Sequence, residues 1–138
     1  MFQTYQLNNC TIEGFEKMSV AEFKVQLEKR TVAFSVMVLK LLRQIPVGME
    51  ARNIRDQLAR SATAVGANYR EANRAESRND FIHKIAVTAK EASEGEYWLL
   101  LLAELDPEVV DIQTVRSEAG ELVRIFDKIR HSASQRQT

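Results

Sequence analysis

The sequence predicts an all-α protein, an antiparallel up-down-up-down four-helix bundle. Apolar residues recur at the helical spacings of three and four through most of the chain, and no alternating strand pattern competes with them. The only two prolines, Pro46 and Pro107, lie where one apolar stretch gives way to the next. Because the connections between these stretches are short, neighbouring helices must run antiparallel, and residues 19–131 are expected to form one bundle.

The first two helices follow from the position of Pro46. We expect the first helix from about Val20 to Ile45, because the residue before a proline avoids the helical region. The second helix is expected from about Glu50 to Ala75, with its apolar residues on one stripe. A turn between the two helices is all that the intervening residues allow.

The third and fourth helices complete the bundle. Ser77 is the expected N-cap of the third helix, with Asp80 three residues later, and the helix should run to about Leu105. The fourth helix is expected to begin near residue 108 or 111 and to end at Arg130, because its apolar residues keep a strict three-four spacing over that stretch.

The two ends of the chain lie outside these helices. Residues 1–18 have a weak apolar pattern, and the sequence leaves open whether they drape over the bundle or stay mobile. Residues 132–138 are expected to form a frayed tail. Cys10 is the single cysteine, so an internal disulfide is excluded, and the first residues do not resemble a secretory signal. A cytoplasmic location is therefore expected.

The composition argues against binding by bulk charge. The 19 basic and 19 acidic residues cancel, which disfavours general attraction to nucleic acid or to an anionic membrane surface. The longest apolar run, residues 98–103, is far shorter than the roughly 20 residues that cross a bilayer. Charge is nevertheless segregated, since no Lys or Arg occurs between Glu91 and Asp111, and a contact between subunits would use this acidic end and a more basic region.

The second helix is rich in small residues between residues 57 and 72. A glycine within a helix costs roughly 1 kcal/mol relative to alanine, so Gly66 predicts the close approach of another backbone. Ala59, Gly66 and Asn73 lie to one side of the main apolar direction, which suits a second packing surface, such as one between subunits.

A row of arginines is expected on the outward side of the second helix. At about 100° per residue, Arg52, Arg55, Arg70 and Arg74 point away from the apolar stripe, and Arg60 lies at its edge. Such a row could contact the phosphates of RNA or DNA, which need arrayed cations. The alternative is a solvated or subunit-facing surface, because acidic residues interrupt the row and it contains no aromatic side chain for base stacking.

Several residues are expected to serve packing instead of chemistry. Glu96 projects from the apolar face of the third helix, and a buried carboxylate must be paired. Its expected partners belong to the second helix: Gln57, Arg60 and Ser61. Asn68 is expected to make a buried hydrogen bond between helices, and Gly95 is grouped with Gly66 as a position of close packing.

Catalysis is not indicated. Asp80 and His83 have the carboxylate-histidine spacing of di-metal sites in helical bundles, but those sites need the motif twice and a glutamate from each of two other helices. The sequence also lacks a phosphate-binding loop, a zinc-protease motif and a nucleophile elbow. We therefore expect no catalytic residue, no metal and no cofactor, and we identify no small-molecule substrate.

Three short motifs, in this order and spacing, resemble a known family: Arg60-Ser61-Ala62 with Val65-Gly66-Ala67-Asn68-Tyr69-Arg70-Glu71-Ala72, then Ser77-Arg78-Asn79-Asp80-Phe81, then Ala92-Ser93-Glu94-Gly95-Glu96. The family is a bacterial group of four-helix bundles first noticed in open reading frames inside intervening sequences of 23S rRNA genes. The resemblance covers residues 20 to 130, although the commoner family pattern has a glycine where Ala72 stands.

This resemblance implies an antiparallel bundle that assembles into a ring-like homopentamer and has no established enzymatic activity. Accessory variability proteins of diversity-generating retroelements share the architecture and are thought to contact nucleic acid and a reverse transcriptase through a basic surface. By this analogy of fold, the sequence predicts a non-enzymatic, oligomeric binding or scaffold module, with RNA or DNA as the favoured partner. The alternative is a protein-interaction scaffold without a role in nucleic-acid binding.

Overall fold

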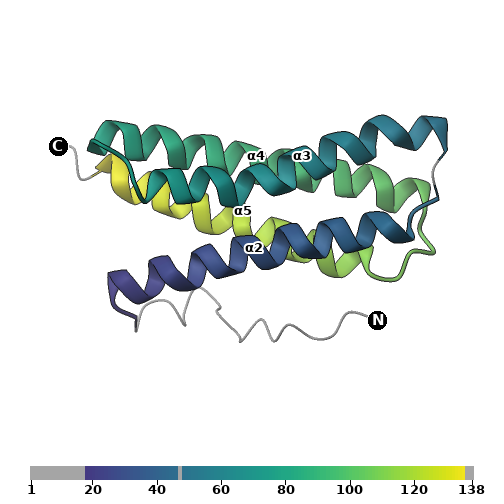
Figure 1. The fold of residues 1–138 in the computed structure, drawn as a ribbon, viewed down its shortest axis with the longest axis horizontal. Helices are drawn as coiled ribbons and strands as arrows, with labels where there is room; N and C mark the ends of the chain where they lie inside the picture. The colour runs from purple at the N-terminus through teal and green to yellow at the C-terminus, as the bar shows by residue number, and fades with distance from the viewer. Residues whose placement is uncertain (1–17, 47, 136–138) are drawn as a thin grey trace.

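The structure is a computed structural model that describes residues 18–46 and 48–135. Its four helices are α2 (Val20–Gln44), α3 (Met49–Ala72), α4 (Arg78–Leu105) and α5 (Ile112–Gln135), and the described residues include no strand. Consecutive helices run antiparallel, as Figure 1 shows. The predicted all-α four-helix bundle is confirmed. The expectations for Cys10 and for the N-terminal segment before Met18 lie outside the described residues.

Two of the predicted helix starts are fixed by their caps. Ser19 caps α2 in a capping box: its hydroxyl accepts from the backbone N–H of Glu22 at 3.2 Å, and the Glu22 carboxylate accepts from the backbone N–H of Ser19 at 3.4 Å. Ser77 caps α4 by accepting from the backbone N–H of Asp80 at 3.1 Å, as the sequence predicts. Both caps satisfy N–H groups that the helix itself leaves without partners.

Two helix ends differ from the prediction. Helix α3 ends at Ala72, before the expected end at Ala75, with Asn73 as its C-cap. Helix α5 continues to Gln135, so residues 132–135 belong to the helix and not to a frayed tail. The Arg78 guanidinium, at the start of α4, donates to the backbone carbonyl of Ala133 at 3.0 Å and satisfies one of the carbonyls in this last stretch.

The core lies between all four helices. Helices α2 and α4 each pack mainly against α3 and α5. In Figure 1, α2 and α5 cross each other below the α3–α4 pair. The largest fully buried side chains come from every helix: Phe34 and Leu41, Leu58 and Tyr69, Ile85 and Leu99, Leu122 and Phe126. Because α2 and α4 stand at opposite corners, each has a side that faces away from the core.

Candidate interaction surfaces

The arginine row of α3 is not one continuous surface, because Arg55 serves the fold. Its guanidinium donates to the backbone carbonyls of Leu42 at 2.8 Å and Ile45 at 2.9 Å. Carbonyls in the last turn of a helix have no partner within that helix, so Arg55 satisfies the C-terminus of α2. The half-buried Arg55 side chain was expected to contact a phosphate, but its guanidinium is engaged by these backbone carbonyls.

Arg60 is also occupied, by carboxylates of α4. Its guanidinium pairs with Glu91 at 3.1 Å and with Glu94, and the indole N–H of Trp98 donates to the same Glu94 carboxylate at 3.1 Å. These hydrogen bonds, first from Arg60 and then from Trp98, hold the pKa of Glu94 below its usual value. The positive charge of Arg60 is thus compensated by these two carboxylates on the α3–α4 surface.

Arg52, Arg70 and Arg74 remain exposed. Arg70 and Arg74 lie one turn apart near the end of α3, and Arg74 donates to the Arg70 carbonyl at 3.4 Å. Arg52 lies in the first turn, about 27 Å away along the axis from Arg70 at 1.5 Å per residue. The five arginines therefore provide one exposed pair and one separate cation, not an unbroken row.

The small residues of α3 pack against α2 of the same chain. A Cβ at Gly66 would lie 3.0 Å from Thr31 Oγ1 on α2, so the two helices approach closely there. Asn73 donates to the Glu28 carboxylate of α2 at 3.1 Å. This side of α3 was expected to suit a second packing surface, such as one between subunits. At Gly66 and Asn73 it is instead covered by α2 of the same chain.

Asn68 and Glu96 differ from their expected roles. The Asn68 amide donates to the Ala64 carbonyl at 2.9 Å, a bond within α3 and not between helices. The Glu96 carboxylate lies beside Gly120 of α5, where a Cβ would be 3.5 Å from it, and within the described residues it has no hydrogen bond to α3. Gly95 faces α3 instead, 3.5 Å from the Ser61 hydroxyl by the same measure. Successive residues point about 100° apart on a helix, so these neighbours face different partners.

Helix α2 carries an apolar stripe on the side away from the core. We define the α2 outer face as Val25, Val32, Val36 and Leu39. Val25, Val32 and Leu39 are exposed by 51, 52 and 43%, and Val36 is half-buried. They lie about one heptad or one turn apart, opposite the direction of the buried residues of α2. A helix that is apolar on both sides is usually covered on both sides.

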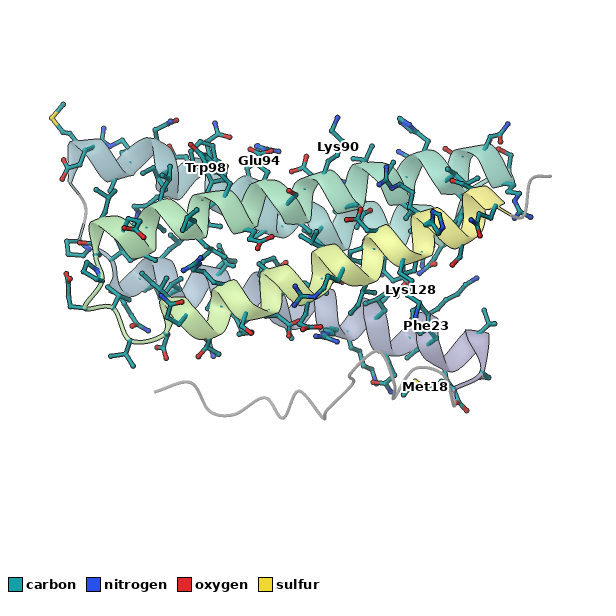
Figure 2. All side chains as sticks on the ribbon, turned by 180° about the vertical axis from the view of Figure 1, so that it is seen from behind. Met18, Phe23, Lys90, Glu94, Trp98 and Lys128 are labelled. Atoms are coloured by element: carbon teal, nitrogen blue, oxygen red, sulfur yellow. The ribbon has the colours of Figure 1, made fainter. Side chains whose placement is uncertain are left out.

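Helix α4 carries a second such surface near its C-terminus. We define the α4 outer face as Tyr97, Trp98, Leu101 and Leu105. Tyr97 and Leu105 are exposed by 52 and 51%, and the other two are half-buried. The rings of Tyr97 and Trp98 meet edge to face with centroids 5.1 Å apart. Figure 2 shows Trp98 and Glu94 along the edge of α4 that faces away from α2.

Comparison with known proteins identifies the family. The family described as 23S rRNA-intervening sequence protein matches residues 24–129. The chain belongs to this family. The resemblance predicted from the three motifs is therefore confirmed, and the match covers all of α3 and α4 and most of α2 and α5.

A solved structure of the same kind supports this assignment. It is a crystal structure from Bacteroides thetaiotaomicron, described as a protein with unknown function from the S23 ribosomal protein family. The TM-score is 0.66 and the sequence identity 31%, over 75% of this chain and 96% of that one. Comparison with curated proteins found no match. The description of the family names no activity, and that of the solved structure gives its function as unknown.

No group of three or more His, Cys, Asp or Glu side chains in residues 18–46 and 48–135 is placed to hold a metal ion, and Asp80 and His83 form no such group. Over the same residues, no helix is both long and apolar enough to cross a membrane. The two outer faces and the exposed arginines are thus the surface features left to explain.

Sequence reasoning missed one buried ion pair. Arg30 of α2 and Glu118 of α5 meet at 2.7 Å, with only 13 and 4% of their side chains exposed. Burial raises the pKa of Glu118, and the hydrogen bond from Arg30 acts against this rise. Glu118 falls between Val115 and Leu122 on the apolar stripe of α5, which is the signal that could have revealed a buried carboxylate.

Proposed function

We propose that this protein is a non-enzymatic scaffold that works as a homo-oligomer. The observation that carries the proposal is the pair of exposed apolar faces on α2 and α4, helices that already contribute their opposite sides to the core. Contiguous apolar patches on a soluble protein are typical of interaction sites. A chain with two such faces at opposite corners is suited to join two neighbours.

The geometry favours this function over nucleic-acid binding. Two of the five candidate arginines are engaged by groups of the chain itself, Arg55 by backbone carbonyls and Arg60 by two glutamates. Phosphate binding depends on several arrayed cations, each of which releases condensed counterions. Because Arg55 and Arg60 are engaged, fewer arginines are left to bind phosphates along α3.

A ring of five copies is the stoichiometry that we propose, and it rests on the resemblance to the family. The expected mass is five times that of one chain, which is 15.7 kDa. Multi-angle light scattering, measured as the protein is diluted through the micromolar range, should return this multiple. A mass of 15.7 kDa at micromolar concentration would reject self-assembly as the basis of function, and another stable multiple would reject only the number five.

Contact with RNA or DNA is a second candidate, supported by Arg70 and Arg74. Within the described residues these exposed side chains have no carboxylate partner, and they lie at the end of the bundle where α4 begins. Gel-shift titrations against structured RNA and duplex DNA at low salt test this candidate, because screening is then weakest. If phosphates are bound, replacing either arginine with alanine should lower the salt slope by about one at most. No shift at high protein concentration would remove the candidate.

A further inference from the structure

We propose that the α2 outer face of one copy packs against the α4 outer face of a second copy. This proposal rests on the proposed self-assembly and names the surfaces that carry it. The placement of the two faces, the charges around them and the aromatic side chains of α4 all favour this contact.

The placement of the faces favours a head-to-tail contact. The two helices stand at opposite corners of the bundle, so the α2 outer face and the α4 outer face point to different neighbours. Two distinct surfaces that recognise each other form a heterologous contact, which closes into a ring when the rotation between copies allows it. Each copy in a ring then has both faces covered.

The charge beside the α2 outer face is basic. Lys29 and Arg43 lie on the same side of α2 as the apolar stripe, and within the described residues neither has a carboxylate partner. The two acidic residues of the helix are engaged elsewhere. Glu22 belongs to the capping box of α2, and Glu28 accepts from Asn73 of α3. The uncompensated charge on this side is therefore positive.

The charge beside the α4 outer face is acidic. No Lys or Arg occurs between residues 91 and 111, whereas Glu104 and Glu108 are exposed near Leu105. Arg60 neutralises part of the charge at the other end of the face through Glu94. Opposite charges around matching surfaces favour the correct encounter, and like charges oppose a wrong one. An α2–α4 contact is complementary, whereas α2–α2 and α4–α4 contacts would bring like charges together.

The aromatic residues of the α4 outer face are suited to anchor the contact. Tyr and Trp are enriched among the residues that dominate binding energy at interfaces. Trp98 is held in place by its hydrogen bond to Glu94 and by the edge of the Tyr97 ring. An anchor that is already ordered loses less conformational freedom on binding. The aromatic surface of this pair thus suits the row of valines and Leu39 on α2.

The test uses one variant of each face. Val32→Glu places an acidic group on the α2 outer face, and Tyr97→Lys places a basic group on the α4 outer face, so each variant repels the intact partner surface. Both positions are exposed, so folding should persist, which circular dichroism checks. We expect each variant alone to sediment as a 15.7 kDa monomer. Gln26→Glu on α2 and Ser117→Glu on α5 are controls that should keep the mass of the wild type.

An equimolar mixture of the two variants decides the geometry. Each variant keeps one intact face, so the mixture should associate through these two faces into a 1:1 pair with twice the 15.7 kDa mass of the chain. The two substituted faces carry opposite charges, so assemblies larger than this pair would also support the α2–α4 contact. Dimers of either variant alone, or a mixture that stays monomeric, would overturn the α2–α4 contact. Variants that both assemble like the wild type would also overturn it while leaving self-assembly intact. A monomeric wild type would instead reject the proposed function itself.

Discussion

Replacing Gly66 with alanine tests the close approach of α2 and α3, with Gly95→Ala as the matched control. Both glycines are buried within long helices, so alanine improves helix propensity by about 1 kcal/mol at either position. They differ in the space for a Cβ. At Gly66 the new carbon would lie 3.0 Å from Thr31 Oγ1 and 3.3 Å from Thr31 Cβ, whereas at Gly95 the nearest atom is the Ser61 hydroxyl at 3.5 Å.

The neighbour of Gly66 is poorly placed to move. Thr31 is fully buried, and its hydroxyl donates to the Glu28 carbonyl at 2.7 Å, which holds the side-chain rotamer. One turn along, the Ser35 hydroxyl donates to the Ala62 carbonyl across the same two helices at 3.0 Å. The helices are therefore joined beside the contact, and a shift of the backbone would strain this bond.

The expected magnitudes follow from these two contributions. Overpacking costs about 1 to 3 kcal/mol, so Gly66→Ala should change the free energy of unfolding by between about zero and a loss of about 2 kcal/mol. Gly95→Ala should raise it by up to about 1 kcal/mol. Gly66→Leu should be the least stable of the three variants, because more volume enters the same space.

Chemical and thermal unfolding followed by circular dichroism measure these differences, at one fixed protein concentration because assembly makes Tm concentration-dependent. Each kcal/mol corresponds to roughly 4 °C in Tm for a domain of this size. If Gly66→Ala and Gly95→Ala raised the free energy of unfolding equally, the contact with Thr31 would not limit the space at Gly66.

Substitutions at Arg55, Glu118 and Glu96 test three other parts of the structure, again through the free energy of unfolding. Arg55→Ala should lose about 1 to 3 kcal/mol, because the Ile45 carbonyl loses its donor and the Leu42 carbonyl keeps only the long bond from the Ile45 N–H. The exposed Arg52→Ala should stay within about 0.5 kcal/mol of the wild type, and equal effects would contradict the capping role. The pKa of Glu118 is raised in the folded state, so its contribution is fully present below the ordinary value of 4.5 and is lost as pH rises through the folded pKa. The stability of the wild type minus that of Glu118→Gln should therefore fall as pH increases through that window, and a rise would mean that the attraction of Arg30 outweighs burial. Glu96→Gln should change stability by less than about 0.5 kcal/mol, because no bond to α3 is broken, and a larger loss would show a partner that we have not assigned.

The sequence predicted most of the fold because its signals are local. The spacing of apolar residues, the Ser77 cap and Pro46 each act on the residues beside them, and the helices follow within a few residues at most ends. The end of α5 was missed because the contact that supports it, from Arg78 to Ala133, joins residues far apart in the chain.

The partners of polar side chains were harder to predict. A helical wheel gives the direction of Glu96 but not which of two neighbouring helices stands on that side, and the structure places α5 there. Likewise, the helical wheel gives the outward direction of Arg55 and Arg60 but not their partners. Arg55 contacts the end of α2, and Arg60 contacts two glutamates of α4. Long side chains take their partners from the tertiary structure, so a row of cations in sequence need not be a row of unoccupied cations in space.

Native mass spectrometry of the purified protein tests whether the chain works as a homo-oligomer without nucleic acid, because it reports the number of chains and any bound nucleic acid together. We expect one dominant species at a whole multiple of 15.7 kDa, fivefold for the proposed ring, with no additional mass. A 15.7 kDa monomer, or an assembly carrying extra mass that nuclease treatment removes, would contradict it.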